Sequence, residues 1–142
     1  MSEISLIPGV DISASGLDAE SRRMEIIANN VANAQATRGP DGKVFQRKEI
    51  VFGEKLDDAF GDDDLGGVEI LEVVADTTPG RRVYRPGHPD AGDDGFLEMP
   101  NVNSVAEMVD MMSASRAFEA NLTAMKTAKT MATKALGILG QN

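Results

Sequence analysis

The stretch "IIANNVANAQATR", residues 26–38, poses the folding problem of this chain. Its alanines and branched apolar residues follow a helical pattern, yet it also carries Asn29, Asn30 and Asn33. Asparagine is disfavoured inside a helix by about half a kcal/mol relative to alanine, because its side chain competes for nearby backbone groups. A helix that keeps three asparagines therefore needs contacts that use their amides.

Working outward from this stretch, the sequence predicts one helix from about residue 10 to 36. The helix follows Pro8–Gly9 and stops at the turn sequence "TRGPDG" (37–42). Apolar residues recur every seven positions, with small residues between them, which gives one narrow seam of coiled-coil type. The seam residues are Leu17, Met24 and Val31.

The opposite face of this helix is rich in amides and carries few charges. At about 100° per residue, Asn29, Asn30 and Asn33 lie opposite Leu17, with Ile26 among them. Amides donate and accept hydrogen bonds without carrying charge, so they can be desolvated when they have partners. This pattern favours contacts on both faces of the helix over a face that is merely polar and solvated.

A second, longer helix is predicted from Ser104 to about Gly137. Ser104 and Glu107 match a capping box, in which each side chain bonds a free amide of the first turn. The predicted seam of this helix shifts by three residues between Met112 and Ser115, a step that would locally overwind a supercoil. The seam consists of Val105, Val109, Met112, Ser115, Phe118, Leu122, Met125, Ala132, Leu136 and Leu139.

The segment between the two helices is acidic and rich in β-branched residues. Residues 49–98 hold fourteen of the acidic groups and four of the basic ones, whereas both ends of the chain are nearly neutral. Strands are predicted at 43–52 and 67–76, with shorter extended pieces within 81–86 and 95–99. We therefore expect a mainly α protein in which N- and C-terminal helices pair as a coiled-coil-like hairpin around a small β-rich insert. The expected segments are 1–37, 38–100 and 101–142.

Composition and motifs argue against catalysis and against ligand binding. His88, the one histidine, lies in the turn sequence "PGHPD", and the chain has no cysteine. The acidic loops fail the spacing of a calcium-binding EF-hand, because Val73 or Asn101 falls where the bidentate glutamate belongs. No phosphate loop or zinc spacing is present. We expect neither an enzyme nor a cofactor or metal site.

The charge pattern also bears on macromolecular partners. The chain carries a net charge of −9 and offers no basic stripe, which argues against nucleic acid. It contains no apolar run long enough to span a bilayer, so no direct membrane insertion is expected. The first ten residues, "MSEISLIPGV", lack the basic and apolar regions of a cleavable signal peptide.

Two blocks of the sequence resemble the bacterial flagellar rod, hook and hook-associated axial proteins. The first is "ISASGLDAESRRMEIIANNVANAQATR" (12–38), with "ANNVANAQATR" as its core. The second block, "VYRPGHPDAGDDGFLEMPNVNSVAEMVDMMSASRAFEANLTAMKTAK" (83–129), is similar to the proximal-rod members of this family. With the connecting segment, the resemblance covers most of the chain.

The resemblance implies a structural subunit of the flagellar basal-body proximal rod. Such subunits polymerise through their terminal helices into a tubular drive shaft that transmits torque across the periplasm and surrounds the export channel. They reach the periplasm through the flagellar type III export apparatus, without a cleaved signal peptide. The implied partners are other rod proteins, copies of this chain and that apparatus.

The resemblance also assigns roles to individual residues. Helix pairing within the chain is expected at Leu17, Met24, Ile27, Val31, Val109, Met112, Phe118, Leu122, Met125 and Leu136. Contacts with neighbouring subunits are expected at Ile26, Asn29, Asn30, Asn33 and Asn121. A further expectation comes from the N-terminal residues themselves: their exposed apolar side chains would dock on the export apparatus, and the alternative is a frayed terminus with no role. These residues are Ile4, Leu6, Ile7 and Val10. The alternative function is a soluble helical adaptor or regulator of flagellar export.

Overall fold

The computed structural model describes residues 8–39, 41–55 and 66–139. In this part of the chain, one helix precedes four strands and the other helix follows them. The predicted arrangement of terminal helices with a small antiparallel β insert between them is therefore confirmed. In chain order the elements are α1 (Pro8–Asn33), β1 (Lys48–Lys55), β2 (Gly67–Ala75), β3 (Arg82–Tyr84), β4 (Phe96–Glu98) and α2 (Ser104–Leu139).

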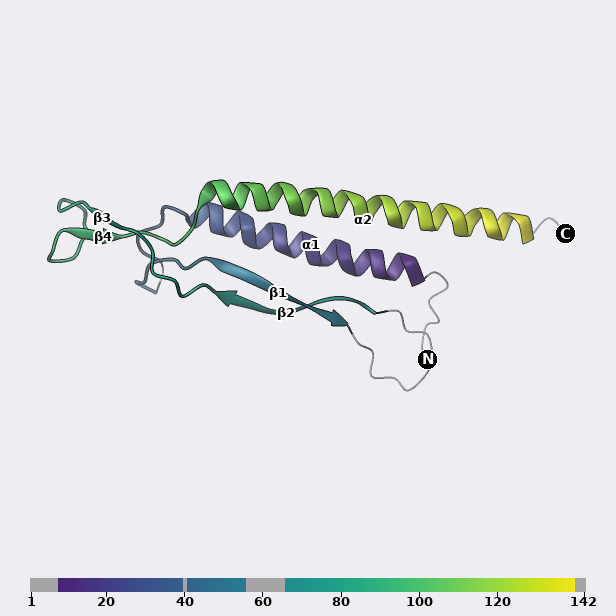
Figure 1. Cartoon of the computed structure of the whole chain (residues 1–142), viewed down its shortest axis with the longest axis horizontal. Helices are drawn as coiled ribbons and strands as arrows, with labels where there is room; N and C mark the ends of the chain where they lie inside the picture. Colours follow the sequence, from purple (N-terminus) through teal and green to yellow (C-terminus); the bar gives the residue numbers. More distant parts are fainter. Residues whose placement is uncertain (1–7, 40, 56–65, 140–142) are drawn as a thin grey trace.

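The elements lie in an extended arrangement in which α1 occupies the middle. Figure 1 shows α1 and α2 side by side and antiparallel, with the β1–β2 hairpin along the other side of α1. The β3–β4 hairpin projects beyond the end where α1 finishes and α2 begins. Because α1 has neighbours on two sides, its polar face is not simply a solvent face.

Both β hairpins are antiparallel and two-stranded. In the first, Lys48 is opposite Ala75 and Lys55 is opposite Gly67, with one irregularity between Val51 and Phe52. In the second, Val83 is opposite Leu97. A two-stranded hairpin is marginally stable by itself, so the first hairpin depends on its contacts with α1.

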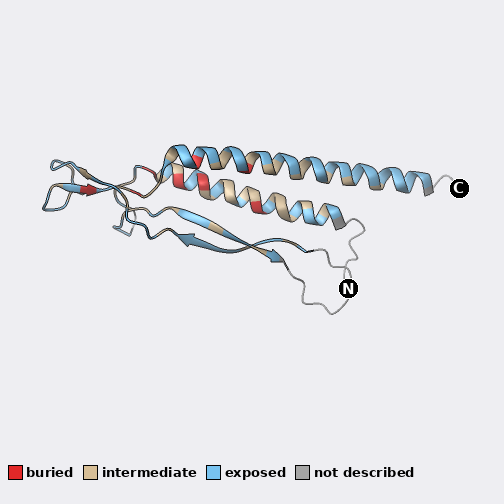
Figure 2. Cartoon of the chain, in the orientation of Figure 1, coloured by how far each residue is buried: buried red, intermediate tan, exposed pale blue. Residues whose placement is uncertain are grey.

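The buried interior is small and consists mostly of small side chains. Figure 2 shows the buried residues concentrated where the second half of α1 meets the first turns of α2, with one on the projecting hairpin. Among the described residues, the buried apolar side chains are Ala19, Ile27, Ala34, Leu97, Pro100 and Ala114, of which Ala114 is fully enclosed. Small side chains let two helix backbones approach closely, so this end of the helix pair is the tightest part of the fold.

The contact face of α2 differs from the predicted seam. One line of buried and half-buried residues along α2 keeps an unbroken three–four spacing: Glu107, Met111, Ala114, Phe118, Asn121, Met125, Ala128 and Ala132. Beside this line, Ser104, Asp110, Ser115, Ala117 and Leu122 are also half-buried. The part of the predicted seam before its three-residue step is wrong, because Val105 is 71% exposed, whereas the seam residues from Ser115 to Ala132 are half-buried. Val109, Met112 and Leu136 are 54%, 55% and 68% exposed, so their predicted pairing with α1 is wrong as well.

The physical reason for this error lies at the start of α2. The prediction followed apolar residues, whereas the contact face begins with the charged Glu107. The predicted capping box is also not formed. Asn103 caps the helix, since its Oδ1 accepts hydrogen bonds from the amides of Val105 at 3.1 Å and Ala106 at 3.4 Å. The side chain of Glu107 is thereby left free for contacts inside the fold.

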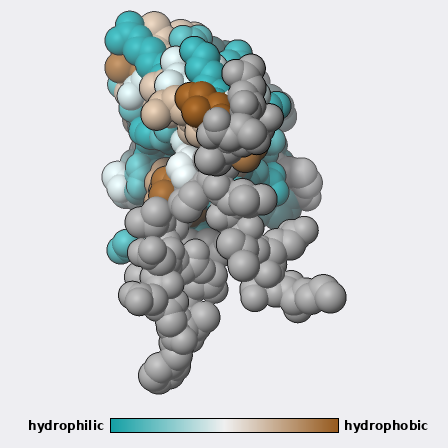
Figure 3. Space-filling model, turned by 90° about the vertical axis from the view of Figure 1, so that its right-hand side faces the viewer, coloured by the Kyte–Doolittle hydropathy of each residue, from teal (hydrophilic) through white to brown (hydrophobic). Residues whose placement is uncertain are grey.

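The antiparallel register leaves the C-terminal part of α2 without α1 beside it. Asn30 is bonded to Glu107, and Gly16 lies against Asn121, so the start of α1 falls near Lys129. Figure 1 shows α2 continuing beyond this point, and Figure 3 shows hydrophobic side chains at the surface among hydrophilic ones at this end of the molecule. Within the described residues, neither helix is long and apolar enough to cross a membrane.

Candidate assembly site

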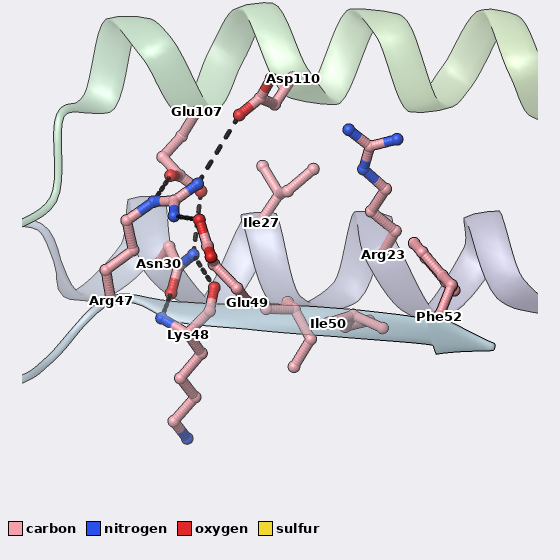
Figure 4. A pocket seen from close by; sticks show the side chains of 11 residues that line it. Arg23, Ile27, Asn30, Arg47, Lys48, Glu49, Ile50, Phe52, Glu107 and Asp110 are labelled. Carbon is pink, nitrogen blue, oxygen red and sulfur yellow. Dashed lines mark hydrogen bonds and ion pairs between the residues drawn. The ribbon is translucent and has the colours of Figure 1, made fainter. Parts of the chain in front are cut away.

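Asn30 is the side chain that joins α1 to both of its neighbours. It is 1% exposed, and its Oδ1 accepts a hydrogen bond from the Lys48 amide at 2.9 Å. Its Nδ2 donates to the Lys48 carbonyl at 2.8 Å and to Oε2 of Glu107 at 2.9 Å. Figure 4 shows these bonds between α1, β1 and α2. The carboxamide thus pairs with the backbone of β1 much as a neighbouring strand would.

Glu107 brings a buried carboxylate to the same place. It is 1% exposed, and its Oε1 accepts a hydrogen bond from Nε of Arg47 at 2.5 Å. Arg47 also pairs with Glu49, and its Nη2 lies 3.8 Å from Asp110. A carboxylate loses its hydration on burial and is tolerated only when it is paired and hydrogen-bonded. Arg47 and Asn30 meet that requirement.

The bonds continue from Arg47 into the connections around the insert. The Arg47 amide donates to Oδ1 of Asn101 at 2.7 Å, and Nδ2 of Asn101 donates to the carbonyls of Asp76 at 2.9 Å and Thr78 at 3.0 Å. Thr78 donates hydrogen bonds to the Asp76 carboxyl, and these bonds lower the pKa of that carboxyl. We call Asn30, Arg47, Lys48, Asn101 and Glu107 the polar cluster.

A groove of about 370 Å³ lies beside the polar cluster, between α1, β1 and the start of α2. Arg23, Ile26 and Phe52 are among its lining residues. In the part of the chain that the structure describes, no three acidic, histidine or cysteine side chains are grouped so that they could hold a metal ion. The polar groups of the cluster are used in bonds within the chain, so the cluster acts as a structural joint.

Of the residues predicted to contact neighbouring subunits, some face the chain itself and others remain available. Asn30 was assigned to neighbouring subunits, and this assignment is wrong because the chain's own β1 and α2 bind its amide. Asn121 lies against Gly16 of α1, and the half-buried Ile26 lines the groove, so both also face the chain itself. The α1 positions that remain for outside contacts are Asn29, which is exposed, and Asn33, whose Nδ2 donates to the Asn29 carbonyl at 2.8 Å.

The remaining predicted residues fall into two groups. Ile27 is buried, and the other predicted pairing residues along α1 and the middle of α2 are half-buried: Leu17, Met24, Val31, Phe118, Leu122 and Met125. Of the residues predicted to dock on the export apparatus, Val10 is half-buried in α1, whereas Ile4, Leu6 and Ile7 lie outside the described residues.

His88 is used to hold a loop in place. Its Nδ1 accepts a hydrogen bond from the Asp90 amide at 3.1 Å. The Asp90 carboxylate accepts one from the Thr37 hydroxyl at 2.7 Å and lies 3.2 Å from Nε of Arg38. This loop is therefore fastened to the segment that follows α1.

The projecting β3–β4 hairpin carries an aromatic pair that the sequence did not single out. Tyr84 and Phe96 meet edge to face with their ring centres 5.2 Å apart, and the Arg82 guanidinium lies 4.9 Å from the centre of the Phe96 ring. Arg82 also pairs with Asp94. The hydrogen bond from the Phe96 amide lowers the pKa of the Asp94 carboxyl, and the Arg82 guanidinium lowers it further by a smaller amount.

The polar cluster generates a prediction with a matched control in the same helix. Asn30→Asp replaces the Nδ2 donor with a carboxylate oxygen facing Glu107, so we expect a loss of roughly 3 kcal/mol in the free energy of unfolding. Asn29→Asp makes the same chemical change at an exposed position and is expected to stay within about 0.5 kcal/mol of the parent chain. Urea unfolding followed by circular dichroism measures both. Equal effects of the two substitutions would contradict the role of Asn30.

Two known protein families match the two helical ends of the chain. Residues 11–40 match the family described as flagella basal body rod protein, and residues 93–138 match the family described as flagellar basal body rod FlgEFG protein C-terminal. These two regions contain most of α1 and of α2.

Relatives match over nearly their full length. The chain is 42% identical to the flagellar basal-body rod protein FlgC of Salmonella typhimurium over 138 residues, which covers 97% of this chain and 100% of that protein. It is 38% identical to the protein of the same name from Borreliella burgdorferi over 150 residues, with 96% and 99% covered. For that of Yersinia enterocolitica, the identity is 38% over 138 residues, with 97% and 100% covered. The chain therefore belongs to the flagellar basal-body rod protein family.

Proposed function

We propose that the chain is a structural subunit of the flagellar basal-body rod, in its proximal part, and that it assembles there through α1 and α2. The observation that carries this proposal is the near-complete match to relatives named flagellar basal-body rod protein FlgC. The same match does not favour an export adaptor or regulator. The polar cluster agrees with a structural role, because its side chains are used within the fold.

The surface of α2 supports assembly through the helices. Large apolar side chains remain exposed along the helix, at fractions from 54% to 73%. They are Val105, Met108, Val109, Met112, Met131, Leu136 and Ile138. Exposed apolar surface on this scale is typical of interaction sites. In the rod, neighbouring subunits would cover it, and the pairing of α1 with α2 would take the form of a short coiled coil within a tubular wall.

The proposed location is the periplasmic part of the basal body, where the chain transmits torque together with other rod proteins and copies of itself. We further propose that the chain arrives through the flagellar type III export apparatus and keeps its N-terminus. Neither torque transmission nor export of the chain requires an enzymatic activity, a cofactor or a bound metal in this protein.

Rod assembly can be tested in cells whose only copy of this gene is altered. Met24→Asp and Leu122→Asp each place a carboxylate at a half-buried position of the helix pair, where it loses part of its hydration. We expect few or no rods in electron micrographs and no swimming in soft agar. Gln46→Asp, on an exposed connection outside both helices, is the control and should leave motility unchanged. Normal swimming of the Met24→Asp and Leu122→Asp cells would contradict assembly through the helix pair.

Docking on the export apparatus is tested by removing residues 2–9. This deletion leaves the contact residues of α1 and α2 in place, so a loss of export would not follow from a loss of helix pairing. We expect the shortened chain to accumulate in the cytoplasm and to be missing from the periplasm when both fractions are measured by immunoblot. Export at the level of the full chain would show that these residues are dispensable for recognition.

A further inference from the structure

The outward-facing side of the β1–β2 hairpin carries apolar and acidic side chains together. Val51 is opposite Glu72, and Leu71 lies over Gly53, which is opposite Glu69. Opposite residues share a face of a sheet, as do residues two apart in one strand. At the irregularity between Val51 and Phe52, β2 has one extra residue, Leu71, which therefore lies on the same face as the adjacent Glu72. This face therefore holds a set that we call the hairpin patch. It consists of Val51, Glu69, Leu71, Glu72 and Val74, all of which are exposed.

A second unpaired surface runs along the C-terminal half of α2. Its positions are four, three and four residues apart, a spacing that keeps them on one line of a helix. We call this line the tail stripe, and it consists of Thr127, Met131, Lys134 and Ile138. Met131 is 66% exposed and Ile138 is 73% exposed, whereas Met125, Ala128 and Ala132 belong to the face toward α1.

The two surfaces have opposite charge. The tail stripe carries one lysine, Lys134, and no acidic residue, whereas the hairpin patch carries two glutamates and no basic residue. Among the described residues, Glu69, Glu72 and Lys134 make no ion pair. Each surface thus combines exposed apolar side chains with charges that would find a partner on the other.

The two surfaces are held apart within one chain. Figure 1 shows α1 lying between α2 and the β1–β2 hairpin, and the polar cluster fixes this order through Asn30 and Glu107. A contact between the tail stripe and the hairpin patch therefore requires two copies. A contact between two different surfaces of identical copies repeats from copy to copy, and it gives a ring if the rotation closes or an open helical assembly if it does not.

We propose that the tail stripe of one copy docks on the hairpin patch of the next. Lys134 lies against Glu69 and Glu72, and Met131 and Ile138 cover Val51 and Leu71. The occupant of each surface is thus a second copy of this chain. This inference rests on the proposed rod function, because it specifies one of the contacts by which copies would join. Complementary charge sets the pairing and steers the approach, while the apolar side chains supply the buried area.

Cross-linking tests the contact directly, because the chain has no cysteine of its own. A chain with both Leu71→Cys and Met131→Cys should form a ladder of disulfide-linked oligomers on mild oxidation, both as concentrated pure protein and in purified basal bodies. Chains with either cysteine alone should stay monomeric, or nearly so. Tyr84→Cys with Met131→Cys is the control, since Tyr84 is 65% exposed but lies on the projecting hairpin.

The outcomes separate the contact from the function. A ladder that depends on both cysteines supports the contact. Absence of a ladder in basal bodies that contain the chain overturns the contact and leaves the rod function standing. Dimers formed equally well by Met131→Cys alone also overturn it, because they would show two tail stripes meeting each other. A ladder from pure protein, with no chain in basal bodies, would instead count against the rod function.

Charge reversal provides a second test that requires no disulfide. In the double-cysteine chain, Glu69→Lys with Glu72→Lys should reduce cross-linking about tenfold, and Lys134→Glu should also reduce it. All three reversals in one chain should restore it, because opposite charges then face each other again. Unchanged cross-linking in the singly reversed chains, or no recovery in the fully reversed chain, would overturn the proposed pairing.

Discussion

The fold depends on α1 packing against a helix, α2, and a strand, β1, at the same time. Asn30 joins α1 to both with one carboxamide, which donates and accepts at the Lys48 backbone and donates to Glu107. An apolar residue there would leave the outward N–H and C=O of Lys48 without partners, and a charged residue would face a buried carboxylate. Asparagine has the required donors and acceptor without a charge, which explains its presence in a helix that it does not otherwise favour.

The polar cluster also explains how a fold with so few buried apolar residues keeps a defined order of elements. Half of its buried apolar side chains are alanines, so the area removed from water is modest. Arg47 and Glu107 add a directional constraint, because a buried ion pair is costly to break once one partner moves away. The result is a firm joint where α1, β1 and α2 meet, and a long stretch of α2 whose apolar side chains await neighbours. Such a distribution suits a subunit that completes its packing on assembly.

Sequence reasoning predicted the two helices, the β insert and its strands, since periodicity and β-branched runs are local signals. It also predicted that α1 needs contacts on both faces. It did not foresee that the chain's own hairpin covers the second face, because strand placement is a non-local property. The face of α2 was misread for a related reason. Glu107 begins the contact spacing, yet a glutamate on a helix is normally solvated, and only the distant Arg47 makes its burial acceptable. A helical spacing that continues from Ala114 back through Met111 to Glu107 was the available signal.

Hydrogen exchange of the free full-length chain, followed by mass spectrometry, tests most directly whether the polar cluster holds the three elements together. Backbone amide hydrogens in packed, hydrogen-bonded segments exchange with solvent only when those segments open. If the cluster is the joint, residues 19–33 of α1, the first residues of β1 and residues 104–118 of α2 should share the slowest exchange and open together. Exchange should become faster toward the start of α1 and along residues 130–139. Rapid exchange of residues 19–33, with protection retained in 104–118, would show that α1 is not held by Asn30 and would contradict this description of the fold.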